Sequence, residues 1–194
     1  PAPQPGWSVD WALENTYGYL AEGEPAHLRY TDLTAGAGAG LAESWAVTGS
    51  YNEGGEVWVP RAFASRKAEE APLASTFVAC LAPYGEAPAV TDPVRLVLQT
   101  SDGQALPDSH VAVQVSLPEG RRDLILVADT ENPLGLTPAY VAGSPMVQPD
   151  WDARCDGEAC WVRESESGRV EAMALAKGLS LIHLSEPTRL LSIS

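Results

Sequence analysis

The feature that most constrains the fold is a series of short segments in which apolar and polar residues alternate, separated by Gly, Pro, Asn and Asp. Alternation with a period of two is typical of half-buried β-strands, and no long stretch shows the 3.6-residue period of a helix. About ten short strands without intervening helices predict an all-β fold, an antiparallel β-sandwich with no substantial helix. The segments expected as strands are 7–11, 27–30, 41–48, 56–59, 73–81, 94–99, 111–117, 123–127, 159–163 and 169–175.

Several connections carry their own expectations. Residues 35–40, an alternating Ala-Gly run, are expected to form a flexible loop, and 132–150, rich in Pro and Gly, a long irregular connection. Pro60 is expected to end the strand at 56–59, because proline cannot donate to a ladder. Residues 62–74 can hold one helical turn at most, since Pro72 interrupts the helical pattern. Glu-Ser-Gly at 166–168 fits a hairpin connection between the last two strands.

The three cysteines are Cys80, Cys155 and Cys160, an odd number that cannot form a closed disulfide framework. Cys155 and Cys160 are close enough in sequence to bridge a short hairpin-like loop, whereas Cys80 sits in an apolar run and fits a small buried side chain. The spacing of Cys and His matches no zinc motif, so we expect no metal site and no cofactor.

The C-terminal residues differ from the rest. Residues 179–189, LSLIHLSEPTR, resemble the translation of a transposase adapter used in sequencing libraries, which reads LSLIHISEPTR. A natural strand followed by a loop is the alternative. We therefore expect residues 1–178 to be one β-sandwich domain and 179–194 a non-native tail, and exclude His183 from the candidate sites. The chain starts without Met, and we expect the domain to be truncated at both ends.

The charge of the chain limits its partners. Twelve Lys and Arg against 26 Asp and Glu give a net charge of −14. Such a chain repels nucleic acid phosphates and anionic membranes, so neither is expected as a partner. No segment approaches the roughly 18 apolar residues of a membrane-spanning helix. An acidic polysaccharide would also be repelled overall, and only a locally basic groove could hold one.

Three stretches resemble the C-terminal β-sandwich domain of the heparinase II/III-like polysaccharide lyase family. They cover most of residues 7–178 in a consistent order: HLRYTDLT at 27–34 with AESW at 42–45; WVPR at 58–61 with LASTFV at 73–78 and LAPYGEAP at 81–88; and RDLIL at 122–126 with WVR at 161–163. The resemblance implies an enzyme with a helical toroid domain before this sandwich, and a periplasmic or secreted location.

The same resemblance implies the chemistry of the whole enzyme, which cleaves uronic-acid polysaccharides by β-elimination. A base removes the C5 proton, a cation or donor neutralises the adjacent carboxylate, and an acid protonates the departing oxygen. In the family most of these groups lie on the toroid, and the sandwich adds a histidine in an HNT-type stretch. This sequence has neither, so no catalytic residue is carried over and the chain alone is expected to be inactive.

Two groups of residues are candidates for substrate binding. His27 and Arg29 lie on one face if their segment is extended, and could contact a uronate or the partner domain. Trp58 could stack on a sugar while Arg61 clamps a carboxylate with two hydrogen bonds. In the alternative interpretation, the first pair belongs to an exposed strand face with a weak surface ion pair, and Trp58 belongs to the core.

Three functions are consistent with these observations. The first is an accessory sandwich of a polysaccharide lyase, which should expose an apolar patch where the toroid docks. The second is a non-catalytic carbohydrate-binding module, which should expose a row of at least two of the six tryptophans. The third is a structural extracellular module with neither feature. Which polysaccharide would be recognised does not follow from the sequence.

Overall fold

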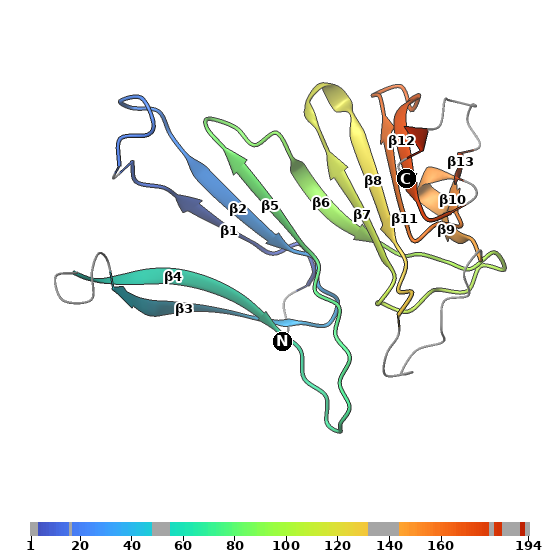
Figure 1. Cartoon of the computed structure of the whole chain (residues 1–194), viewed down its shortest axis with the longest axis horizontal. Helices are drawn as coiled ribbons and strands as arrows, with labels where there is room; N and C mark the ends of the chain where they lie inside the picture. The colour runs from blue at the N-terminus through green and yellow to red at the C-terminus, as the bar shows by residue number, and fades with distance from the viewer. Residues whose placement is uncertain are drawn as a thin grey trace.

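The computed structural model describes residues 4–15, 17–47, 55–131 and 144–178, together with the backbone of 181–183 and 191–192. About 49% of the chain is strand, and no helix reaches seven residues in the part that is described. The expectation of an all-β antiparallel fold without a substantial helix is confirmed. The strands form a six-stranded sheet, two three-stranded sheets and a two-stranded ribbon (Figure 1).

The largest sheet has the order β14-β12-β11-β8-β7-β6. Its five long strands are antiparallel, and the short β14 runs parallel to β12. Neighbours in sequence pair through short turns, as between β11 and β12, where Gly168 has a positive φ of 78° and donates to the Ser165 carbonyl. The expected hairpin is therefore present. The bounds are β6 Thr91–Leu96, β7 Val111–Ser116, β8 Arg122–Val127, β11 Ala159–Glu164, β12 Val170–Ala176 and β14 Leu191–Ser192.

A second layer packs against one face of this sheet. It contains β9 (Met146–Gln148), a 3-10 turn (Pro149–Trp151), β10 (Ala153–Cys155) and β13 (Leu181–His183), with β10 in the centre. Leu124, Leu126 and Val162 are fully buried in the core between the layers. Trp151 is 2% exposed, and its indole N–H donates to Gln114 at 2.7 Å. This pairing of layers forms the main core of the chain.

The three-stranded sheet has the order β1-β2-β5, with β1 Ser8–Ala12, β2 His27–Asp32 and β5 Ala79–Tyr84. Leu33, directly after β2, packs on Val113 and Val115, which lie on the other face of β7. Asp32 is 1% exposed and accepts hydrogen bonds from the backbone N–H of Thr34 at 2.9 Å and from Tyr30 at 2.6 Å. These contacts anchor the end of β2 to the larger sheet.

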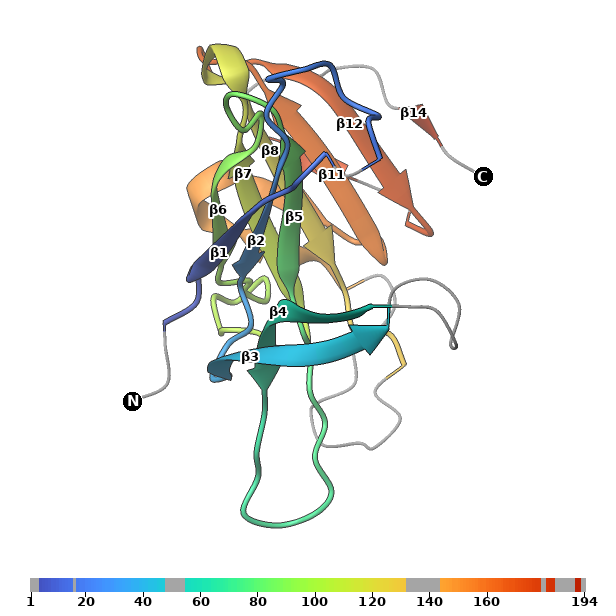
Figure 2. The ribbon, with the colours of Figure 1, turned by 90° about the vertical axis from the view of Figure 1, so that its left-hand side faces the viewer.

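Strands β3 (Gly38–Val47) and β4 (Glu56–Ser65) form an antiparallel ribbon that projects away from the rest of the chain (Figures 1 and 2). In Figure 2 the ribbon lies across the lower end of the three-stranded sheet. Its apolar side chains are unusually exposed, with Leu41 at 74%, Trp58 at 61% and Phe63 at 50%. Large exposed apolar surfaces of this kind mark sites of interaction.

The Ala-Gly run is not the flexible loop that the sequence predicts. Gly38 to Gly40 belong to β3, and only the residues before them turn. Gly36 has a φ of +63°, which few other residues adopt at low cost. At Gly40 an added Cβ would lie 2.2 Å from the Phe63 ring, so the ring covers the bare glycine backbone. The glycines therefore shape the start of the ribbon, which the composition alone did not indicate.

Other boundaries differ from the sequence-based expectations. Strand β4 continues through Pro60 to Ser65, which removes the expected strand end, and residues 66–74 contain no helical turn. The strand expected at 73–81 begins only at Ala79 and continues through Pro83. Within the expected irregular connection, Met146–Gln148 forms β9 and residues 132–143 lie outside the described part. In the tail, described residues pair as β13 and β14, and the remainder lies outside it.

Candidate functional site

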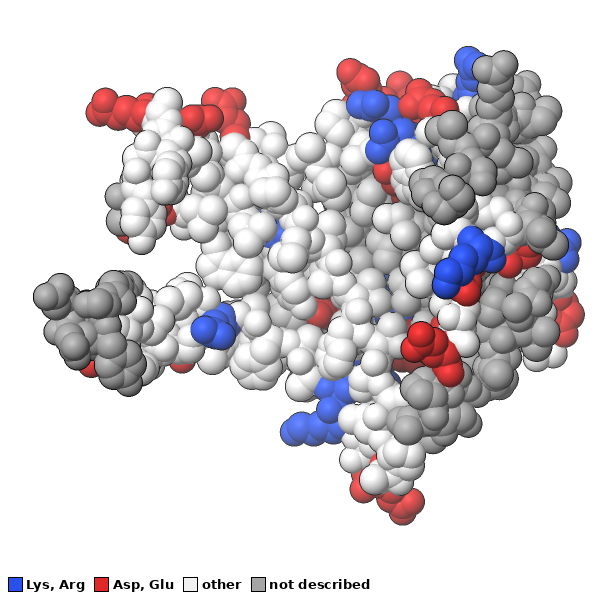
Figure 3. Space-filling view, in the orientation of Figure 1, with Lys and Arg blue, Asp and Glu red and all other residues white. Residues whose placement is uncertain are grey.

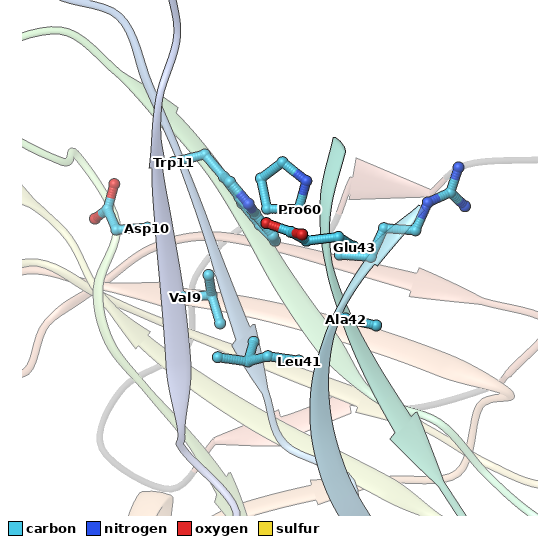
Figure 4. Close-up of a pocket in the computed structure, with 8 residues that line it drawn as sticks. Val9, Asp10, Trp11, Leu41, Ala42, Glu43 and Pro60 are labelled. Atoms are coloured by element: carbon cyan, nitrogen blue, oxygen red, sulfur yellow. The ribbon is translucent and has the colours of Figure 1, made fainter. Parts of the chain in front are cut away.

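Strand β1 separates two candidate sites, because its successive side chains point to opposite faces. Asp10 points away from the ribbon, whereas Val9 and Trp11 point toward it (Figure 4). The register places Asp10 opposite Arg29 and Ala12 opposite His27. One face of the three-stranded sheet thus carries a polar cluster, and the other lines a cleft against the ribbon.

The polar cluster consists of Asp10, His27, Arg29 and Tyr84. Arg29 donates to Asp10 through Nε at 2.8 Å, with Nη2 equally close, and the Tyr84 hydroxyl donates to the same carboxylate at 2.6 Å. His27 Nδ1 lies 3.6 Å from the other carboxylate oxygen. The rings of His27 and Tyr84 are stacked with centroids 4.8 Å apart. The structure therefore brings the predicted pair together and adds two partners that the sequence analysis missed.

The electrostatics of the cluster centre on Asp10. The hydrogen bond from Tyr84 has the largest effect and lowers the pKa of the Asp10 carboxyl; burial opposes it, and Arg29 lowers the pKa further. The bond to Asp10 raises the pKa of the Tyr84 phenol and of the Arg29 guanidinium. A phenol held as a donor to a carboxylate is poorly suited to remove a proton from a substrate. In the same way, the charge of Arg29 is largely compensated within the chain.

The second site is a cleft of about 580 Å³ between β1 and the ribbon. Val9 and Trp11 form one wall, and Leu41, Glu43 and Pro60 form the other, with Glu43 and Pro60 opposite Trp11 (Figure 4). Most of the lining side chains are apolar, and the charged residues are Asp10, Glu43 and Arg61. A cleft with largely apolar walls and a few polar groups is a common form of ligand site.

The ribbon register shows which side chains leave from the face that borders this cleft. Glu43 pairs with Pro60 and Trp45 pairs with Trp58, so all four lie on the same ribbon face as the cleft. Arg61 pairs with Ala42 one step along, so its side chain leaves from the opposite face, although both residues still line part of the cleft. The structure therefore does not bring the predicted pair of Trp58 and Arg61 together. Trp58 is exposed and does not belong to the core.

A smaller cleft of about 380 Å³ lies between β1, β2 and β6, with Arg29 and Arg95 in its lining. Arg95 donates to the backbone carbonyls of Leu33, at 3.3 Å, and of Asp108. Burial lowers the pKa of Arg95 against the opposing effect of Asp108. Both guanidiniums are thus engaged by the chain itself, which limits their ability to bind an external carboxylate.

The cysteines and metal ligands complete the inventory of reactive groups. Cys155 of β10 and Cys160 of β11 form a disulfide, so the bridge joins the two packed layers. Cys80 is a free thiol on β5, and burial raises its pKa. Over the described residues, no three metal-ligating side chains gather in one place. Within the same residues, no helix has the length and hydropathy needed to cross a bilayer.

The surface charge agrees with the division into two faces. In Figure 3 the facing surfaces of the β1–β2 arm and the ribbon carry few charged residues, and acidic side chains gather over the connection between β1 and β2. Glu14, Glu22 and Glu24 belong to this connection. A basic group also lies on the ribbon beside the gap in this view, and Arg61 is part of the cleft lining, so the cleft borders charges of both signs.

Comparison with known proteins adds no relative. The chain matches no protein-family model, no curated protein and no solved structure. The geometry and the sequence motifs alone therefore support the assignment of function.

Proposed function

We propose that the chain is the accessory β-sandwich domain of a heparinase II/III-like polysaccharide lyase. In this proposal it contributes to β-elimination on uronic-acid polysaccharides only together with a helical toroid domain of the same protein. The observation that carries the proposal is the projecting ribbon of β3 and β4, whose apolar side chains lack cover in the described structure. Such a surface fits a domain that is stabilised by a partner.

The ribbon face opposite the cleft is the side that we assign to the toroid. Val57, Val59, Arg61 and Phe63 occupy every second position of β4, and the three apolar side chains are 39%, 38% and 50% exposed. By strand alternation they project from one face. Interfaces between domains of one chain commonly combine apolar residues with polar or charged ones, as this face does.

The polar cluster supports the expectation that this chain alone does not catalyse elimination. A base must accept the C5 proton, and a cation must neutralise the uronate carboxylate. In the cluster Tyr84 is committed as a donor, and Asp10 compensates Arg29. We propose that His27 and Arg29 contact the acidic polymer or the toroid from the rim of the active site, while the groups that perform the chemistry lie on the toroid.

The disulfide supports a periplasmic or secreted location as part of the same proposal. Disulfides persist in oxidising compartments and are rare in the cytosol. Cys155 and Cys160 are 0% and 3% exposed, so the bridge belongs to the core rather than to a reactive surface.

The test is to recover the coding sequence upstream of this segment and to express the extended protein beside the present chain. Both are incubated with heparan sulfate, alginate and hyaluronan, and the unsaturated uronate product is followed by ultraviolet absorbance. We expect product from the extended protein and none from the chain alone. Activity of the chain alone, or an upstream region that encodes no helical domain, would contradict the proposal.

A carbohydrate-binding module without catalytic partner is the second candidate. It is favoured by one observation, the exposure of Trp45 and Trp58 at 49% and 61% on the same ribbon face. A purely structural extracellular module would need neither this pair nor the cleft beside it. Sugar binding by the isolated chain separates these two alternatives.

A further inference from the structure

The cleft and the exposed tryptophans form one continuous strip on the ribbon. Leu41, Glu43 and Trp45 are alternate residues of β3, so they project from one face in a row. The last of these residues is four residue steps along the extended strand from the first, a length of about 13 Å. Trp58 lies beside Trp45 on the neighbouring strand, and Trp11 faces the row across the cleft.

The side chains on this strip are suited to the two surfaces of a sugar ring. Tryptophan rings offer flat apolar faces with a polar edge, which suits the C–H faces of a pyranose. The Glu43 carboxylate is acceptor-only when ionised, and sugar hydroxyls are donors. Trp58 and Trp45 are already exposed, so the strip can be occupied without rearrangement of the core.

The charge on the strip selects among sugars. Glu43 is the ionised group on the strip's own face. Asp10 and Arg61 also line the cleft, although each leaves its strand from the opposite face, and the three groups together carry a net negative charge. A polyuronate chain would bring carboxylates toward Glu43 and toward a chain of net charge −14. Uncharged pyranoses meet no such repulsion.

From this combination we propose that the strip formed by Trp11, Leu41, Glu43, Trp45 and Trp58 is a binding site for an uncharged pyranose polysaccharide. The site goes beyond the lyase proposal: it uses the opposite face of the sheet from His27 and Arg29, and it holds whether or not a toroid precedes the chain. It would give the protein a second carbohydrate contact, one that selects against uronates.

The test is electrophoresis of the present chain in native gels that contain hydroxyethylcellulose, galactomannan or xyloglucan, with alginate as the acidic comparison. We expect at least one uncharged polymer to retard the chain and alginate not to. Trp58→Ala and Trp45→Ala should each lower the affinity roughly tenfold or more, because each removes a large apolar contact. Phe63→Ala, an equally exposed aromatic on the other ribbon face, is the matched control and should leave retardation unchanged.

A charge variant separates the proposed site from a generally sticky surface. Glu43→Arg should weaken retardation by the uncharged polymer and introduce retardation by alginate, since the repulsive group is replaced by an attractive one. Circular dichroism and thermal unfolding confirm that each variant is folded. The proposal is overturned if no uncharged polymer retards the chain, or if Phe63→Ala abolishes retardation as fully as Trp58→Ala. Since no elimination is measured, the outcome does not depend on that of the lyase test.

Discussion

Removal of the disulfide gives the sharpest test of how the two layers are held together. Cys155 and Cys160 close a loop with a sequence separation of 5, and both sulfurs lie in the main core. In the chain-entropy model, a loop of this length restricts the unfolded chain enough to contribute about 2 kcal/mol to stability. Replacement of both residues by Ala should therefore lower the free energy of unfolding by about 2 kcal/mol or slightly more, since two buried sulfurs are also lost.

The assay is equilibrium urea unfolding followed by tryptophan fluorescence, with and without a reducing agent. Reductant should lower the stability of the wild type by a similar amount and leave the double variant unchanged. Cys80→Ala is the control, because Cys80 is a free thiol outside the bridge. Thiol titration of the denatured, non-reduced wild type should find one reactive thiol per chain.

Two results would refute this reasoning. Three reactive thiols per chain would show that the bridge is absent. A double variant as stable as the wild type, with the bridge confirmed in the latter, would show that it does not restrict the unfolded chain. A loss well above about 4 kcal/mol would instead assign most of the effect to core packing, which large-to-small substitutions in cores can reach.

Three further perturbations have defined outcomes in the same unfolding assay. Leu124→Ala, at a fully buried position, should cost about 2–5 kcal/mol, whereas Leu41→Ala, at 74% exposure, should stay within about 0.5 kcal/mol of wild type. Asp32→Ala should cost about 2 kcal/mol or more, because it leaves the Thr34 N–H and the Tyr30 hydroxyl without the carboxylate that accepts from them. The difference in free energy of unfolding between wild type and Asp10→Asn should be greatest between pH 3.8 and 10.0. Because folding lowers the pKa of Asp10, the stabilisation by its carboxylate is lost as the pH falls through that lowered pKa. Because folding raises the pKa of Tyr84, the stabilisation by its hydroxyl is lost as the pH rises through that raised pKa. A pH-independent difference would show that the bond between them does not form.

Alternation along the sequence was sufficient to predict most strands, because many of them, such as β1 and β11, bury one face more than the other. One boundary failed because Pro60 was expected to end a strand. Pro60, Pro83 and Pro93 all lie inside strands, and each of these strands is at the edge of its sheet in the described topology. A missing N–H is tolerated at an edge, so the sequence rule applies only once the strand order is known. The short β9 and β10 were missed because three residues carry too little periodicity.

The candidate site was predictable only in part for a related reason. His27 and Arg29 are close in sequence, and alternation alone places them on one face. Asp10 and Tyr84 are 74 residues apart, and only the pairing of β1 and β5 with the strand between them brings the two side chains together. Trp58 and Arg61 are near in sequence yet lie on opposite ribbon faces. In a continuous strand, residues three positions apart project from opposite faces, but the expected strand end at Pro60 concealed this.

The position of Asp10 beside Trp11 gives β1 a means of choosing its alignment on β2. A slip of one residue would carry the carboxylate into the apolar cleft and the indole against Arg29, so the wrong alignment would be unfavourable on both faces at once. An edge strand of five residues has few other contacts with which to reject such a slip. The ion pair of Asp10 and the indole of Trp11 therefore favour one register of β1 on β2, and the shape of the cleft depends on that register.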